Sequence, residues 1–184
     1  MPQISQLLNN RYRLHQHLSS NAGRQTWLAQ DMTTAPPSRV VLKLLAFSPQ
    51  MQWEEFQLFE REAEVLQSLK HPCLPRYRDY FSIDAREGEG LHWFALVQDY
   101  IPGKSLQQLL NQGYHFNEQQ VQAIAVQVLK ILHDLHSLNP PILHRDLKPS
   151  NLIVGLYAVK RTANQQSHTR ANERRVYLID FGTK

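Results

Sequence analysis

Short runs in which apolar and polar residues alternate dominate the first hundred positions. Alternation predicts β-strands, because successive side chains of a strand point to opposite faces of the sheet. A turn-rich break at 19–23 separates the first two runs, and this predicts a hairpin. The segment 33–38 contains two adjacent prolines and is predicted to be a loop. The predicted strands cover residues 12–18, 26–29, 39–45, 77–83 and 91–98.

One helical pattern interrupts these strands at residues 52–69, where large apolar residues recur at helix spacing. Glu62 falls on the apolar stripe of this helix. Lys43 stands alone among apolar residues in the strand 39–45. A charge is costly to bury unless a partner of opposite charge accompanies it. The residues alone therefore predict that Lys43 and Glu62 pair, either as a purely structural ion pair or as part of a site.

The second half of the chain changes to helical periodicity. We predict a short helix over 105–112, with Ser105 or a neighbour as its cap, and a longer helix over 117–138, with Asn117 as its N-cap. Apolar residues cover about half of the circumference of the longer helix, which indicates that more than one neighbour covers it. Two short apolar strands follow at 152–154 and 176–179, joined by a polar and basic surface loop at 155–175.

Composition narrows the class of protein. The 42% of apolar and 20% of charged residues are typical of a globular domain. The apolar runs are too short to span a membrane, and the N-terminus lacks the pattern of a signal peptide. One cysteine suits a reducing cytoplasm. A net charge of +4 without interleaved aromatic residues argues against nucleic-acid binding. We therefore expect a cytoplasmic protein with no membrane segment and no nucleic-acid partner.

Two motifs bear on chemistry. The stretch 144–151 reads His-Arg-Asp-Leu-Lys-Pro-Ser-Asn, and residues 180–182 read Asp-Phe-Gly directly after an apolar strand. The first matches the catalytic-loop pattern H-R-D-x-x-x-x-N, and the second matches the magnesium-binding D-F-G. On these motifs the chain resembles the protein kinases, and specifically the bacterial Ser/Thr kinases of the eukaryotic type. The segment 20–29 looks most like that of cyanobacterial members.

The resemblance covers about residues 11–182 and implies an α+β fold with two lobes. An N-lobe over 11–101 would hold a five-stranded antiparallel sheet and one helix. A mainly helical, truncated C-lobe would occupy 102–184. The connector at 101–103 is where two such lobes could meet.

The resemblance also implies roles for single residues. Asp146 would accept or orient the proton of the substrate hydroxyl, and Lys148 would neutralise charge on the transferring phosphoryl group. Asn151 and Asp180 would bind Mg²⁺. Lys43 would contact the α- and β-phosphates of ATP while Glu62 holds it. Phosphoryl transfer depends mainly on positioning and charge neutralisation, which these residue types supply.

Further positions of the resemblance surround the nucleotide. Backbone groups of Asp99 and Ile101 would meet adenine, and Gln98 falls at the gatekeeper position. Side chains of Val41, Thr26 and Ile153 would line the adenine pocket. An internal spine would stack Leu66, Tyr77, His144 and Phe181. The glycine-rich phosphate loop would fall at Ser19, Asn21, Gly23 and Arg24, of which only Gly23 is glycine.

The kinase pattern ends shortly after the D-F-G motif, so the sequence leaves two readings open. The first is an ATP- and Mg²⁺-dependent kinase, acting on Ser or Thr hydroxyls of proteins, whose sequence is truncated. The second is a catalytically inactive fragment that serves as a nucleotide-binding or protein-interaction module. A partner could cover the exposed apolar face of the helix 117–138. Arg145, which pairs with the activation segment in the family, would lack that partner.

Overall fold

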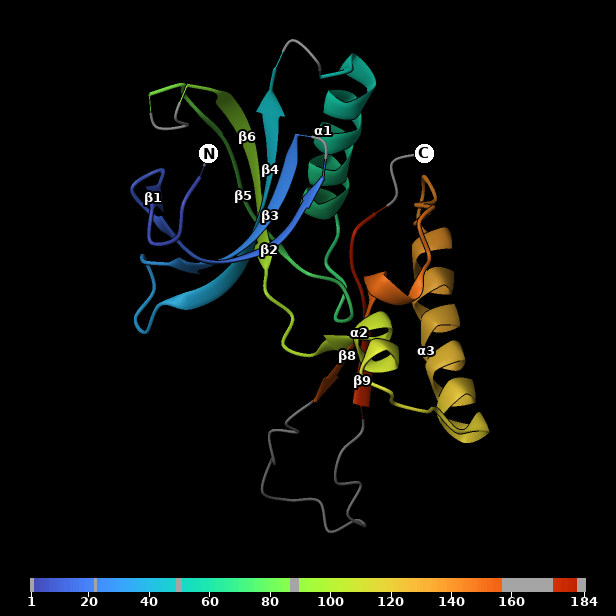
Figure 1. Ribbon diagram of the computed structural model, residues 1–184. Helices are drawn as coiled ribbons and strands as arrows, with labels where there is room; N and C mark the ends of the chain where they lie inside the picture. The colour runs from blue at the N-terminus through green and yellow to red at the C-terminus, as the bar shows by residue number, and fades with distance from the viewer. Residues whose placement is uncertain (1, 22, 49–50, 87–89, 157–173, 182–184) are drawn as a thin grey trace. The chain divides into compact units, whose positions relative to one another are not determined.

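The computed structural model describes residues 2–21, 23–48, 51–86, 90–156 and 174–181 (Figure 1). The chain divides into two compact units. The first comprises the residues up to Lys70 together with Pro75–Tyr100, and the second comprises His71–Leu74 with the residues from Ile101 onward. Most of the predicted loop 155–175, with its basic tract, lies outside the described residues, as does Gly182 of the D-F-G motif.

A six-stranded antiparallel sheet forms the first unit, in the order β1-β2-β3-β4-β6-β5. All five predicted strands are present, and a strand of two residues, β1, adds a sixth at the edge. The strands are β1 (Leu7–Leu8), β2 (Tyr12–Asn21), β3 (Arg24–Asp31), β4 (Ser38–Phe47), β5 (Tyr77–Ile83) and β6 (His92–Asp99). The predicted break at 19–23 is too long, because β2 continues to Asn21 and β3 begins at Arg24.

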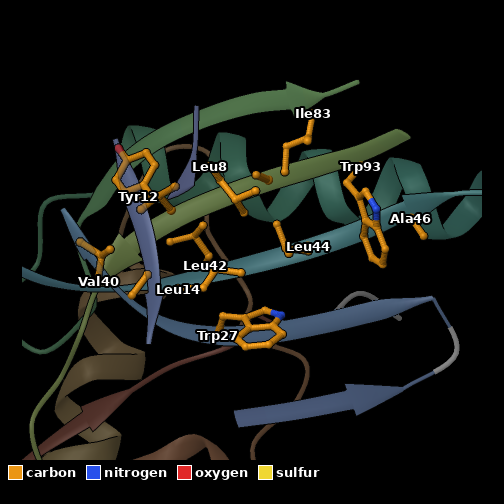
Figure 2. Close-up of a cluster of buried hydrophobic side chains, with 13 residues drawn as sticks. Leu8, Tyr12, Leu14, Trp27, Val40, Leu42, Leu44, Ala46, Ile83 and Trp93 are labelled. Atoms are coloured by element: carbon orange, nitrogen blue, oxygen red, sulfur yellow. The ribbon is translucent and has the colours of Figure 1, made fainter. Parts of the chain in front are cut away.

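Apolar side chains fill one face of this sheet. Figure 2 shows Leu8, Tyr12, Leu42, Leu44 and Trp93 gathered there in one cluster. Along β4 these residues alternate with Val41, Lys43 and Leu45, which therefore lie on the opposite face. The sheet thus separates an apolar interior from the face that carries Lys43.

Helix α1 (Trp53–Ser68) packs on the face of the sheet that carries Lys43. The rings of Phe56 and Phe94 lie 4.7 Å apart, and those of Phe59 and Tyr80 lie 6.1 Å apart. Phe59, Ala63 and Leu66 are buried, as the apolar stripe predicted. The helix therefore presents Glu62, also buried, toward the sheet.

The described part of the second unit contains two α-helices and a small sheet. Helices α2 (Leu106–Asn111) and α3 (Glu118–His136) begin at Ser105 and Asn117, and each cap forms a reciprocal capping box with the glutamine three residues later. Both predicted caps are confirmed. The antiparallel sheet has the order β7-β8-β9, with β7 (Lys104–Ser105), β8 (Leu152–Leu156) and β9 (Arg174–Leu178). A 3₁₀ turn, η1 (Pro149–Asn151), precedes β8.

The wide apolar stripe of α3 is only partly covered. Ile131 and Leu135 are buried, whereas Val121 and Leu129 are 53% and 64% exposed. Within the described residues, no helix is both long enough and apolar enough to cross a membrane.

Candidate active site

The segment between α3 and β8 brings three polar side chains together. Asn151 ends η1 and is 3% exposed. Its Nδ2 donates to the backbone oxygen of Asp146 at 3.0 Å and to Oδ2 of Asp146 at 3.0 Å. The ammonium group of Lys148 lies 2.6 Å from the same Oδ2 atom. Asp146, Lys148 and Asn151, predicted from the motif, therefore form one hydrogen-bonded cluster.

This cluster controls the charge of Asp146. The hydrogen bond from Lys148 holds the pKa of the Asp146 carboxyl below its usual range, and the charge of Lys148 and the amide of Asn151 act in the same direction. Both charged side chains remain substantially exposed, at 40% for Asp146 and 51% for Lys148, so water screens their attraction. Asp146 is consequently a carboxylate at neutral pH and can accept a hydrogen bond from a hydroxyl group.

The residues around Asp180 are attached to the same segment. The N–H of Ile179 donates to the backbone oxygen of Asn151 at 3.0 Å. Nε2 of the buried His144 lies 3.0 Å from the carbonyl oxygen of Ile179, so this nitrogen carries the proton. The rings of His144 and Phe181 lie 5.0 Å apart. Asp180 is thereby held between two anchored neighbours.

In the described part of this unit, two residues other than glycine have a left-handed backbone. Arg145 has φ of 61° and Asp180 has φ of 60°. Such values cost energy in residues other than glycine and are maintained only where surrounding contacts impose them. Each of these residues lies beside His144 or Ile179, whose mutual hydrogen bond supplies such a contact. No pattern in the sequence indicates these two conformations.

The first unit contains the other charged pair. Nζ of Lys43 on β4 and Oε1 of Glu62 on α1 form a hydrogen-bonded ion pair. The two side chains are 13% and 6% exposed, so the pair is largely removed from water. The pairing predicted from the residues alone is therefore confirmed.

Cross-strand register places other predicted residues on the same face as Lys43. Thr26 of β3 is directly opposite Lys43, and Val41 is directly opposite Gln98 of β6. Side chains of directly opposed residues point to the same face of an antiparallel sheet. Thr26, Val41 and Gln98 therefore share the face that carries the ion pair.

The predicted phosphate loop is a tight hairpin turn in this structure. Ser19 and Asn21 belong to β2 and pair with Thr26 and Arg24 of β3. Gly23 has φ of +81°, a value that glycine adopts without strain, and its carbonyl accepts a 2.8 Å hydrogen bond from the N–H of Ala46. Ser19 and Asn21 are thus strand residues, contrary to the predicted break.

The residues predicted to contact adenine lie at the ends of elements. Asp99 ends β6, and its backbone N–H donates to the oxygen of Arg76 at 2.9 Å. Its side chain pairs with Arg78 of the adjacent strand β5, an ion pair that the sequence reasoning missed. The opposite charges of Arg78 and Asp99 on neighbouring strands could have indicated this ion pair. Ile101 belongs to the second unit, as does Ile153 on β8.

A second polar network was also missed. Nε and Nη2 of Arg11 donate to the two carboxylate oxygens of Asp31, at 2.9 and 2.7 Å. Arg11 also lies 3.4 Å from Asp79, whose Oδ2 accepts a 2.9 Å hydrogen bond from Tyr12. These residues join β2, β3 and β5 from distant parts of the chain, so no local pattern could indicate the network.

Sequence comparison relates the chain to one family. The family described as "Protein kinase domain" matches residues 30–184. Serine/threonine-protein kinase C of Synechocystis sp. is 34% identical over 183 residues, which cover 96% of this chain and 29% of that protein. Serine/threonine-protein kinase B of the same organism is 32% identical to this chain over 179 residues, which cover 27% of that protein. Serine/threonine-protein kinase PknA of Nostoc sp. is 30% identical to this chain over 184 residues, which cover 28% of that protein. The chain therefore spans less than a third of the length of these relatives.

Proposed function

This chain belongs to the protein kinase domain family, and we propose that it takes part in transfer of the ATP γ-phosphate to a Ser or Thr hydroxyl of a protein. The single observation that carries the proposal is the cluster in which Lys148 and Asn151 both contact Oδ2 of Asp146. A structural ion pair would need only two of these residues. The additional amide fixes the carboxylate in one orientation, as positioning of a reacting hydroxyl requires.

In the proposed mechanism Asp146 orients the acceptor hydroxyl. Its lowered pKa makes it a weak base that is ionised throughout the physiological range, so it holds the hydroxyl by accepting its hydrogen bond and takes the proton late. Lys148 lies close enough to Asp146 to place its positive charge beside the same acceptor. A lysine suits this role because its ammonium is a flexible point charge.

The residues present also fit magnesium. This hard cation prefers oxygen ligands and is usually bound by one or two protein groups together with substrate phosphates. Nδ2 of Asn151 donates to Asp146, and Oδ1 accepts a 3.3 Å hydrogen bond from Oγ of Ser150. An amide oxygen has two lone pairs, so Oδ1 could also bind a metal. Asp180 would supply a carboxylate oxygen. The described residues contain no group of three or more His, Cys, Asp or Glu side chains that would form a complete protein metal cage. A bound Mg²⁺ would neutralise phosphate charge.

For the first unit we propose a nucleotide-binding role. The ammonium of Lys43, held by Glu62, would contact the α- and β-phosphates, and Thr26 and Val41 on the same face would contact adenine. At Asp99 the backbone N–H is already engaged, so its carbonyl would meet the adenine amine. Ser19, Asn21 and Gly23 would approach the phosphates. In the second unit, we propose backbone contacts with the nucleotide for Ile101 and a side-chain contact for Ile153.

Protein Ser/Thr hydroxyls are the proposed acceptors because the relatives are named serine/threonine-protein kinases. The same proposal includes a cytoplasmic location, supported by the single cysteine and by the use of ATP.

Nucleotide binding without transfer is the alternative. The observation that favours it is the hairpin turn, in which Ser19, Asn21 and Arg24 replace the three glycines of the family pattern. Glycines allow backbone amides to approach phosphates closely, and side chains at these positions restrict that approach. The γ-phosphate would then be positioned poorly for transfer, while Lys43 could still contact the α- and β-phosphates.

Two measurements on the 184-residue chain test the proposal. The first is the thermal unfolding midpoint with and without Mg-ATP; we expect an increase that Lys43→Met removes. The second is transfer of the γ-phosphate to a generic Ser/Thr substrate, which Asp146→Asn should reduce by at least 100-fold, a typical loss for a group that handles the proton. Asp84→Asn, an exposed site in a turn, is the matched control.

The outcomes separate the alternatives. A Mg-ATP shift with transfer that depends on Asp146 supports the kinase reading. A shift without transfer supports the binding module. The absence of any shift contradicts nucleotide binding by this chain, with or without transfer, and is the result expected of a fragment that serves only as a protein-interaction module.

A further inference from the structure

An unusual group of aromatic side chains lies at the start of α1. The rings of Phe47 and Phe94 lie 6.3 Å apart, those of Phe94 and Phe56 lie 4.7 Å apart, and those of Phe56 and Trp53 lie 5.2 Å apart. The four residues form a continuous series across the end of β4, the beginning of β6 and the first turn of α1. We call this series the aromatic platform.

The platform is exposed at both of its ends. Trp53 is 61% exposed and Phe47 is 53% exposed, while Phe56 and Phe94 between them are half-buried. Other tryptophans of this chain, Trp27 and Trp93, are 5% and 2% exposed and belong to the core. A large aromatic ring that leaves water on binding contributes strongly to affinity, and contiguous exposed rings are typical of interaction sites.

The negative charge next to the aromatic platform indicates which kind of partner it would bind. Helix α1 carries five glutamates and one arginine. Glu62 is neutralised by Lys43, but Glu54, Glu60 and Glu64 are exposed. Glu60 and Glu64 follow Trp53 at intervals of seven and eleven residues, so they lie on the same face of the helix. The exposed surface therefore changes along α1 from aromatic to acidic.

We propose that the aromatic platform and the acidic face of α1 together bind a segment of a partner protein that combines an apolar anchor with basic residues. The anchor would cover Trp53 and Phe47. At a rise of ~1.5 Å per helical residue, Glu60 and Glu64 lie ~10 and ~16 Å along the helix axis from Trp53. An extended segment advances ~3.3 Å per residue, so its lysines or arginines would lie about three and five residues from the anchor.

The probe is a ten-residue peptide with a Phe-Leu anchor and lysines three and five residues away from it. It is made in two versions, one with the lysines after the anchor and one with the lysines before it. Its binding to the full chain is measured by the anisotropy of a label on the peptide. Two further peptides, one with glutamates in place of the lysines and one with serines in place of the anchor, test each half of the recognition. Acrylamide quenching of tryptophan fluorescence in wild type and Trp53→Phe first measures how accessible Trp53 is.

Matched variants locate the site on the protein. We expect Trp53→Ala to weaken binding of the basic peptide at least tenfold, whereas Ile4→Ala, an apolar residue of the same unit that is 65% exposed, leaves it unchanged. Glu60→Lys with Glu64→Lys should weaken binding at least fivefold, and Glu118→Lys in the second unit should not. Far-ultraviolet circular dichroism of each variant confirms that it is folded.

Several results would overturn the proposal. Equal binding of the glutamate peptide would show that charge does not specify the partner. Unchanged affinity in Trp53→Ala would place the site elsewhere. Protection of Trp53 from acrylamide in the free chain would show that the platform is already covered. Sedimentation that reveals dimers lost in Trp53→Ala would assign the surface to a second copy of this chain. None of these measurements uses ATP or transfer, so failure here is distinct from failure of the proposed function.

Discussion

Nδ2 of Asn151 donates to both the backbone oxygen and the side-chain oxygen of Asp146, each at 3.0 Å. One buried amide thus positions the backbone and the carboxylate of the same residue. The arrangement explains why the loop requires an amide here. A carboxylate would present oxygen to oxygen, and an apolar side chain would remove the donor that both oxygens share, leaving Oδ2 with Lys148 alone.

We predict that Asn151→Asp destabilises the chain by about 1–3 kcal/mol, because a second carboxylate would face Asp146 and a buried donor would be lost. Urea denaturation at pH 7 measures the free energy of unfolding. Gln119→Glu, at an exposed position of α3, adds the same charge and serves as the control. Equal stability of Asn151→Asp and this control would contradict the role assigned to the amide.

Asp31 should make stability depend on pH in the acid range. Its hydrogen bonds from Arg11 hold the pKa of the buried Asp31 carboxyl well below its usual range. In the unfolded chain this group has a pKa of about 3.9, so below that pH the unfolded state binds the additional proton. The stabilisation is therefore complete above about pH 4 and is lost as the pH falls further toward the folded-state pKa.

The variant Asp31→Asn isolates this effect. We expect a loss of about 2–4 kcal/mol at pH 7, because the guanidinium of Arg11 loses the nearer of its two charged partners and keeps only Asp79, at 3.4 Å. We also expect a shallower decline of stability below pH 4. Urea denaturation between pH 2.5 and 7 measures both, with Asp84→Asn as the control. A pH profile parallel to that of wild type would rule out Asp31 as the source.

Tyr12 and Tyr80, whose hydroxyl groups are both buried, provide a comparison. The hydroxyl of Tyr12 donates to Asp79, whereas the hydroxyl of Tyr80 is buried and has no hydrogen-bond partner within the described part of the chain. Burial raises the pKa of Tyr80 to about 12, so the hydroxyl stays neutral. We predict that Tyr12→Phe costs about 1–2 kcal/mol while Tyr80→Phe is neutral or stabilising. Chemical denaturation of the two variants measures this difference. A comparable loss in Tyr80→Phe would mean that a bound water satisfies the hydroxyl.

The structural role of the pair Lys43 and Glu62 can be tested separately from its role in nucleotide binding. Lys43→Met leaves the carboxylate of Glu62 buried without its cation and should cost about 3 kcal/mol. The double variant Lys43→Met with Glu62→Leu should recover much of that loss, because it removes both charges. We expect the double variant to fold but to show no thermal shift with Mg-ATP. If Mg-ATP raises the unfolding midpoint of the double variant as much as that of the wild type, the pair has only a structural role.

Much of the fold follows from local pattern. The prediction of strand 77–83 matches β5 in full, and the helix caps at Ser105 and Asn117 are present as predicted. Capping depends on residues three positions apart, so the sequence contains all the necessary information. The two-residue strands β1 and β7 were missed because two residues are too few to show any period.

The amino-acid sequence alone predicts the types of the main elements, contains the motifs at 144–151 and 180–182, and indicates that Lys43 pairs with Glu62. That partnership was predictable because a lone charge in an apolar strand requires a counter-charge. Three features are visible only in the folded chain: Arg11 pairs with Asp31, Asn151 donates two hydrogen bonds to Asp146, and Arg145 and Asp180 adopt a left-handed backbone. These features depend on groups brought together by packing, and local periodicity contains no information about such contacts.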